Sequence, residues 1–118
     1  MQVFQKVLDK SLNYQFDGRY KLDEILFFDI ETTGFSPKTT VVYLIGCVYY
    51  SEGTFKTIQW FADDKYSEAK ILQAFFQHLK KYKVLIHFNG EGFDIPYIQK
   101  KCIQYQLNCN FDHIESID

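Results

Sequence analysis

The stretch "LFFDIETTGF", Leu26 to Phe35, joins an apolar run to two acids and decides how the rest of the chain is interpreted. The apolar residues favour β-structure and are typical of a buried strand. Asp29 and Glu31 lie two positions apart, so their side chains leave the same face of that strand. Adjacent carboxylates repel each other, and a shared proton, a basic partner or a divalent cation would relieve the repulsion. On its own, the pair also fits a solvated strand end.

Working outward from this strand, apolar patterns and turn signals predict one small α/β domain. The expected elements are strands at Glu24 to Ile30, Val41 to Tyr50 and Thr54 to Phe61, a helix from Ser67 to Tyr82, a strand at Val84 to Phe88 and a helix from Asp94 to Gln106. The second strand is apolar almost throughout, so we expect burial on both of its faces. A strand that returns after a crossover helix lies parallel to an earlier strand. The sequence therefore predicts a mixed sheet with a three-stranded antiparallel meander, a helix, a parallel strand and a helix.

The two ends of the chain carry weaker signals. Val3, Phe4, Val7 and Leu8 have a helical spacing within a polar stretch, so residues 1–23 are expected to form an N-terminal arm or short helix. Residues 24–118 are expected to form the folded domain. The final segment "NFDHIESID" could begin one more strand.

Composition excludes several classes of protein. The chain has 118 residues with 47% hydrophobic residues, which is enough for a packed core, and a net charge of −2. That charge excludes a strongly basic nucleic-acid binder that works by charge alone. No apolar run approaches the roughly 20 residues needed to span a bilayer, so no membrane partner is expected. The three cysteines lack the spacing of a structural zinc site, and free thiols fit a cytoplasmic protein.

A second constellation, "HFNGEGFDIPYI", covers His87 to Ile98. It places a strand, a glycine-containing loop, an acid and a helix with an early proline in sequence, so Asp94 follows the C-terminal end of a parallel strand, where α/β sheets place their sites. A plain helix cap at Asp94 and ordinary turn residues at Asn89 and Gly90 are the structural alternatives. If the strands before the two constellations are neighbours, three acids meet at one edge of the sheet. A pair of metal ions would neutralise such a cluster.

The two motifs together resemble a known family. "FFDIETTGFSP" is similar to the first motif of the DEDD 3′–5′ exonucleases, which have the RNase H-like fold. "HFNGEGFDIPYI" is similar to their second motif, in the form also found in the proofreading domains of family B DNA polymerases. Within this family the chain most resembles the YprB-like group of bacterial exonuclease domains, in which "YLIGC", as at Tyr43 to Cys47, also recurs. The resemblance covers about Glu24 to Asp118.

The resemblance implies a metal-dependent 3′–5′ exonuclease that hydrolyses phosphodiester bonds of nucleic acid from a single-stranded 3′ end, with two Mg²⁺ or Mn²⁺ ions. It implies three catalytic metal ligands, of which the first bridges both ions and the second also orients the attacking water: Asp29, Glu31 and Asp94. It also implies six positions that approach the 3′ end or shape the cleft at the terminal nucleotide: Thr32, Thr33, Gly34, Asn89, Gly90 and Phe93.

One departure from the family pattern limits the expected activity. The family has a fourth acid in a third motif, on a later helix, accompanied by a tyrosine or histidine. Asp112, His113 and Asp118 come too early in the chain for that role. The domain is therefore expected to be incomplete, with its C-terminal part missing, and weak or inactive as it stands. Two alternatives remain open: a catalytically incomplete module that binds nucleic acid, and a homo-oligomerisation module that associates through an uncovered sheet edge.

Overall fold

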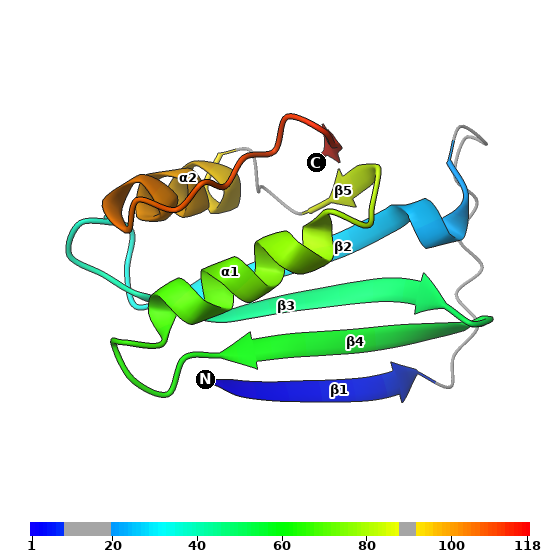
Figure 1. Cartoon of the computed structure of the whole chain (residues 1–118), viewed down its shortest axis with the longest axis horizontal. Helices are drawn as coiled ribbons and strands as arrows, with labels where there is room; N and C mark the ends of the chain where they lie inside the picture. The colour runs from blue at the N-terminus through cyan, green and yellow to red at the C-terminus, as the bar shows by residue number, and fades with distance from the viewer. Residues whose placement is uncertain (9–19, 88–91) are drawn as a thin grey trace.

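A six-stranded mixed sheet with two α-helices packed on it forms the fold (Figure 1). The computed structural model describes residues 1–8, 20–87 and 92–118. The elements in chain order are β1 (Gln2–Leu8), a short 3₁₀ helix η1 (Leu22–Glu24), β2 (Ile25–Thr32), β3 (Val42–Ser51), β4 (Thr54–Phe61), α1 (Glu68–Leu79), β5 (Val84–Ile86), α2 (Asp94–Gln104) and β6 (Glu115–Ile117). The strands lie side by side in the order β1-β4-β3-β2-β5-β6. The mixed α/β sheet predicted from the sequence is confirmed.

Strand pairing brings the two acid-bearing segments together. Strands β2, β3 and β4 form the antiparallel meander, and β5 lies parallel to β2 with Ile25 opposite Val84. Strands β2 and β5, which carry or precede the two acid motifs, are therefore neighbours in the sheet. The final segment also forms the further strand that was expected, because β6 pairs in parallel with β5.

The hairpin between β3 and β4 turns through Glu52 and Gly53. Both residues have positive φ, 54° and 79°, and Ser51 pairs with Thr54 directly across the turn. Two-residue loops with positive φ at both central positions match the right-handed twist of the flanking strands. Glycine adopts this conformation without strain, which explains why the short "SEG" segment closes the hairpin.

Of the arm or short helix expected near the N-terminus, the helix is wrong for residues 2–8, because these residues form strand β1. This strand pairs antiparallel with β4, with Val3 opposite Trp60. The outer edge of β4 offers unpaired N–H and C=O groups, and pairing with them outweighs a weak helical spacing. Val3, Phe4 and Val7 remain about half exposed, at 46%, 52% and 52%, so no buried helical face exists here. Residues 9–19 lie outside the described part of the chain, and the domain boundary at residue 23 stays a prediction.

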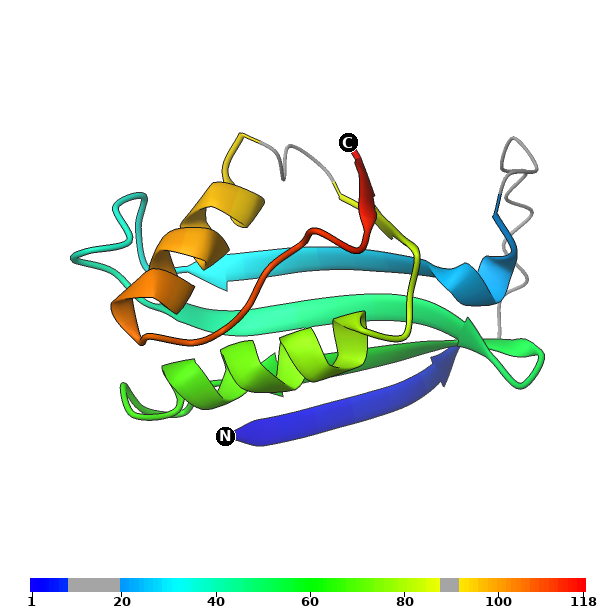
Figure 2. The ribbon, with the colours of Figure 1, turned by 45° about the horizontal axis from the view of Figure 1, so that its top comes forward.

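The core lies between the sheet and its helices, which cover the same face (Figure 2). Strand alternation turns Phe28 and Ile30 toward the helices, where they meet Phe75 of α1 and Tyr97 of α2 in one cluster. The expectation that the second strand is buried on both faces is wrong, because residues on its opposite face, including Leu44, are only partly buried. In the parts of the chain that are described, no helix has the length and apolarity needed to cross a membrane.

A buried histidine in this core should make stability depend on pH. His78 of α1 packs against Tyr49, Trp60 and Tyr82, and burial lowers its pKa to about 4. The unfolded chain therefore takes up a proton at His78 near pH 6.5, while the folded chain stays neutral until about pH 4.

Stability from the neutral His78 is thus complete above pH 6.5 and falls as the pH is lowered toward 4. Between pH 7.5 and 4.5, the free energy of unfolding should fall by about 1–2 kcal/mol less in the His78→Gln variant than in the natural protein, as measured by urea unfolding. Identical pH profiles for the two proteins would show that His78 is not the titrating group.

Candidate active site

Asp29 and Glu31 project from the C-terminal half of β2, on the face of the sheet opposite the helices. Their strand neighbours on β3 are Gly46 and Leu44. Both carboxylate residues are exposed, while Phe28 and Ile30 between and before them are buried in the core. The two acids line a hollow of about 370 Å³ on this face. The buried apolar residues therefore fix strand β2 in the sheet, so that both carboxylates point in the same direction.

Asp94 is the first residue of α2 and is buried, with 6% of its surface exposed. Phe93 occupies the N-cap position, so Asp94 is not the plain cap that the structural alternative required. Its Oδ2 atom is buried without a hydrogen-bond partner in the structure. Burial raises the pKa of Asp94 to about 6, the neighbouring carboxylates of Asp29 and Glu31 add to the rise, and a backbone hydrogen bond at Ile30 opposes it. Asp94 therefore lies close enough to Asp29 and Glu31 for their charges to raise its pKa, although it does not line the hollow that they share.

The three carboxylates provide the hard oxygen ligands that Mg²⁺ and Mn²⁺ prefer. Among the residues that the structure describes, no group of three or more His, Cys, Asp or Glu side chains is already arranged to hold a metal ion. The unpartnered Oδ2 of Asp94 and its raised pKa show that the charged form of this carboxyl lacks stabilising partners, which a bound cation would supply. The oxygen donors of these three residues therefore fit a divalent cation, although the described side chains do not already surround one metal position.

The residues after Glu31 form a tightly bonded turn. The hydroxyl of Thr32 donates to the carbonyl of Gly34 at 2.7 Å, and the hydroxyl of Thr33 accepts from the amide of Val41 at 2.9 Å. A side chain at Gly34 would place its Cβ 2.7 Å from Cγ2 of Thr40, so only glycine fits this turn as it stands. These three predicted substrate-binding positions follow the acid pair directly in the chain. Each of them also has a structural role, because each stabilises the turn.

Phe93 lies beside Phe35, a residue for which the sequence predicted no role. Its ring lies 6.2 Å from the ring of Phe35, edge to face, and Phe35 is 89% exposed. An aromatic side chain so exposed, beside the residue that precedes Asp94, offers a stacking surface for a base. The sequence signal was present, because Phe35 directly follows the turn glycine and belongs to no apolar pattern. Asn89 and Gly90 lie outside the described residues.

His87, at the end of β5, is a second residue without a predicted role. It is 2% exposed and lines the same hollow as Asp29 and Glu31. Its Nε2 atom lies 2.5 Å from the hydroxyl of Ser116, and its Nδ1 atom lies 3.7 Å from the carboxylate of Asp118. The imidazole therefore ties the terminal strand β6 to the floor of the hollow.

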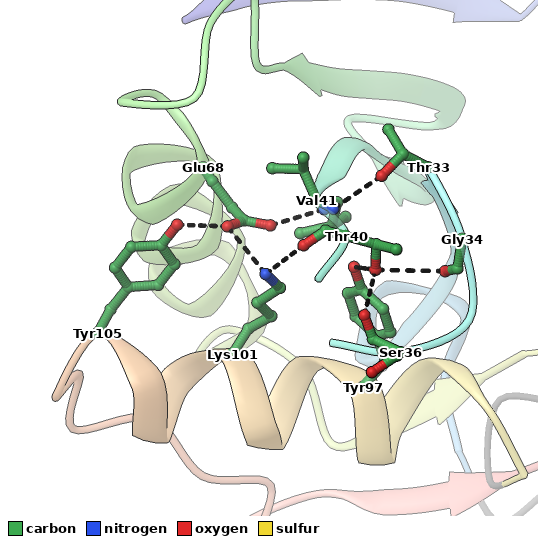
Figure 3. Close-up of polar contacts among 10 residues, drawn as sticks. Thr33, Gly34, Ser36, Thr40, Val41, Glu68, Tyr97, Lys101 and Tyr105 are labelled. Carbon is green, nitrogen blue, oxygen red and sulfur yellow. Dashed lines mark hydrogen bonds and ion pairs between the residues drawn. The ribbon is translucent and has the colours of Figure 1, made fainter. Parts of the chain in front are cut away.

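A buried polar network holds α2 against the turn that follows the acid pair (Figure 3). The ammonium of Lys101 lies 3.3 Å from a carboxylate oxygen of Glu68 and donates to the carbonyl of Thr40 at 2.5 Å. The other carboxylate oxygen of Glu68 accepts from the amide of Val42 at 2.6 Å, and the hydroxyl of Tyr105 also donates to Glu68. Glu68 and Lys101 are 1% and 2% exposed, so this ion pair is screened from solvent. The network joins α1, β3 and α2 around one point.

Comparison with known proteins places this geometry in a family. The profile of the RNase H superfamily matches residues 26–117, which include both acid motifs and the strands between them. The chain belongs to the RNase H superfamily. Its sheet and helices have the RNase H-like arrangement that the resemblance implied.

A solved structure supports the fold independently. The family B DNA polymerase from the hyperthermophilic archaeon Pyrobaculum calidifontis matches with a TM-score of 0.59 and 21% identity. The match covers 70% of this chain and 11% of the polymerase chain, so it concerns a small part of that protein and the fold alone. A search of curated proteins gave no match.

Proposed function

We propose that this RNase H superfamily domain is a metal-dependent 3′–5′ exonuclease of the DEDD type, related to the YprB-like group, that acts on single-stranded ends of nucleic acid. The observation that carries the proposal is the approach of buried Asp94 to the exposed pair Asp29 and Glu31, with one oxygen of Asp94 left unpartnered. Such a cluster is unfavourable by itself and becomes favourable when divalent cations bind.

Asp29, Glu31 and Asp94 would hold the metal ions. When bound, a pair of Mg²⁺ or Mn²⁺ ions supplies positive charge for the scissile phosphate and for the attacking and leaving oxygens. The protein residues have separate tasks. Strand β2 holds the two exposed carboxylates and α2 carries the third. The rings of Phe35 and Phe93, which lie edge to face, would stack with the terminal base. The turn at Thr32 to Gly34 holds the backbone close to where the 3′ end would lie.

The proposal is tested with a single-stranded oligonucleotide labelled at its 5′ end. We expect stepwise shortening from the 3′ end in Mn²⁺, none in EDTA, and a loss of at least about 100-fold in rate for the Asp29→Asn variant. High-resolution gels or mass spectrometry would resolve the ladder of products.

A matched control keeps contaminating nucleases out of the result. The Asp112→Asn variant changes the same charge at an exposed position outside the acid cluster and should cleave like the natural protein. Equal cleavage by the Asp29→Asn and natural proteins would contradict the proposal. Cleavage from the 5′ end would contradict the polarity while leaving a nuclease in place.

A second candidate is a module that binds nucleic acid without cleaving it. It is favoured by the exposed ring of Phe35 beside Phe93, because a base can stack on such a surface without any metal ion. The same assay separates the two functions, because this candidate predicts binding of the oligonucleotide with no shortening under any divalent cation. Association through an exposed sheet edge stays a further alternative, which light scattering over a range of concentrations would detect.

A further inference from the structure

A groove runs along α2, away from the candidate active site. Its larger part has a volume of about 760 Å³ and is lined by Ser36, Pro37, Lys38, Lys100, Ile103 and Gln104. A smaller hollow of about 140 Å³, at the start of α2, is lined by Phe35, Phe93 and neighbouring residues, and shares Pro37 and Lys100 with the larger part. The two hollows therefore adjoin each other, and together they are called the groove. The groove begins at the aromatic pair beside Asp94 and follows the helix toward Gln104.

The charge of the groove is opposite to that of the site where it begins. Lys38 and Lys100 are exposed and line the groove, and none of the described lining residues is acidic. Within the described residues, neither lysine forms an ion pair, whereas the adjacent Lys101 is buried against Glu68. Two free cations therefore face the groove in a chain whose net charge is −2. A polyanion is the complementary occupant.

The walls of the groove are held in place before any ligand arrives. One wall is the turn at Ser36 to Lys38 and the other is α2. The hydroxyl of Thr40 lies 2.7 Å from the hydroxyl of Tyr97 and donates to the carbonyl of Ser36 at 2.6 Å, and Lys101 donates to the carbonyl of Thr40 (Figure 3). A preformed groove loses little conformational freedom on binding, so modest contacts can produce measurable affinity.

The dimensions fit a short single strand. From Asp94 to Gln104 the helix rises about 15 Å, which spans about four nucleotides at the 3.4 Å phosphate spacing of a stacked strand. Ile103 is 76% exposed at the far end, where it offers an apolar surface to a base or sugar. Alternating apolar surfaces and cations are the pattern of grooves that bind single strands without sequence preference.

We propose that this groove binds the segment of a single-stranded nucleic acid that lies on the 5′ side of the terminal nucleotide, with Lys38 and Lys100 pairing with backbone phosphates. The inference rests on the proposed function, because that function places the 3′ end at the acid cluster. It adds the path of the strand and a minimum length. Oligonucleotides of about four or more nucleotides should bind through the groove, and dinucleotides should not reach it.

The test measures binding apart from cleavage. Fluorescence anisotropy with oligothymidylates of two, four and eight nucleotides is recorded in EDTA, in the Asp29→Asn background. Adding Lys38→Ala and Lys100→Ala should weaken binding of the eight-nucleotide probe about 10- to 30-fold and leave the dinucleotide within about twofold. The slope of log affinity against log salt should fall by about 1.4, because each phosphate contact on a single strand contributes about 0.7.

The control pair Lys70→Ala with Lys81→Ala removes the same charge from exposed positions on or beside α1 and should leave the slope unchanged. An unchanged slope in the groove variant, equal losses in both pairs, equal weakening for all probe lengths, or no measurable binding at 50 mM salt before the lysines are changed would each overturn the proposal. Equal competition by polyglutamate would also overturn it, because the groove would then bind any polyanion. If Mn²⁺ gives no cleavage but the groove variant loses affinity as stated, the exonuclease proposal fails and the groove stands.

Discussion

Replacing Asp94 with asparagine should make the metal-free protein more stable while it removes binding of Mn²⁺. In the natural chain, burial and the nearby charges of Asp29 and Glu31 disfavour the ionised form of Asp94 and raise its pKa to about 6. The Asp94→Asn substitution removes one of the three charges, and its amide can donate to the carboxylate of Asp29. The same change removes a carboxylate that a divalent cation needs.

The sign of the stability effect depends on pH. The folded pKa of Asp94 lies above its unfolded value of 3.8, so the folded protein is destabilised once Asp94 ionises, fully so above pH 6. We expect Asp94→Asn to gain about 1–2 kcal/mol at pH 7.5, a rise in Tm of about 4–8 °C, and to gain nothing near pH 4. Mn²⁺ affinity measured by calorimetry should fall at least about 100-fold, because even residues that only support metal ligands cost 10- to 100-fold.

Asp112→Asn provides the matched control, since it makes the same change at an exposed acid. It should alter Tm by no more than about 2 °C and leave Mn²⁺ binding as it is. If the Asp94→Asn protein were less stable than the natural protein, the carboxylate of Asp94 would be stabilising the folded state. Unchanged Mn²⁺ binding in the more stable variant would remove Asp94 from the ligand set.

The parts of the fold that sequence predicted are those set by local patterns. The run before Asp29, the two-residue turn at Glu52 and Gly53, and the amphipathic face of α1 each carry their structure in a few consecutive residues. The meeting of Asp29 with Asp94 was also predictable, because a crossover connection forces two parallel strands to end at one edge of the sheet.

The parts that sequence did not predict depend on partners far away in the chain. Strand β1 forms because the edge of β4 is available for pairing, and no pattern within Gln2–Leu8 predicts that pairing. Glu68 and Lys101 sit among other charged residues on their helices, where a solvated position is the ordinary expectation. Their burial depends on how α1 and α2 pack near the start of β3, and a local sequence pattern cannot predict this packing.

Replacing Lys101 with methionine should be among the most destabilising single changes in this protein. Methionine matches the lysine stem in length but leaves the carboxylate of Glu68 buried without a counter-charge, and it removes the bond to Thr40. Breaking a buried ion pair by removing one partner costs about 3–5 kcal/mol. The free energy of unfolding of a small domain is only about 5–15 kcal/mol, so the Lys101→Met variant should unfold at far lower urea concentrations than the natural protein.

The double variant Glu68→Gln with Lys101→Met separates the buried charge from the shape of the site. Glutamine keeps an oxygen for the amide of Val42, so the double variant should regain all but about 1–2 kcal/mol of the lost stability. Lys100→Met, one position away and exposed, should change stability by less than about 0.5 kcal/mol. A double variant no more stable than Lys101→Met would show that the loss comes from the lysine's contact with Thr40 rather than from an unpaired carboxylate. In that case the tie between α2 and the turn, and not the ion pair, would be what stabilises this corner of the fold.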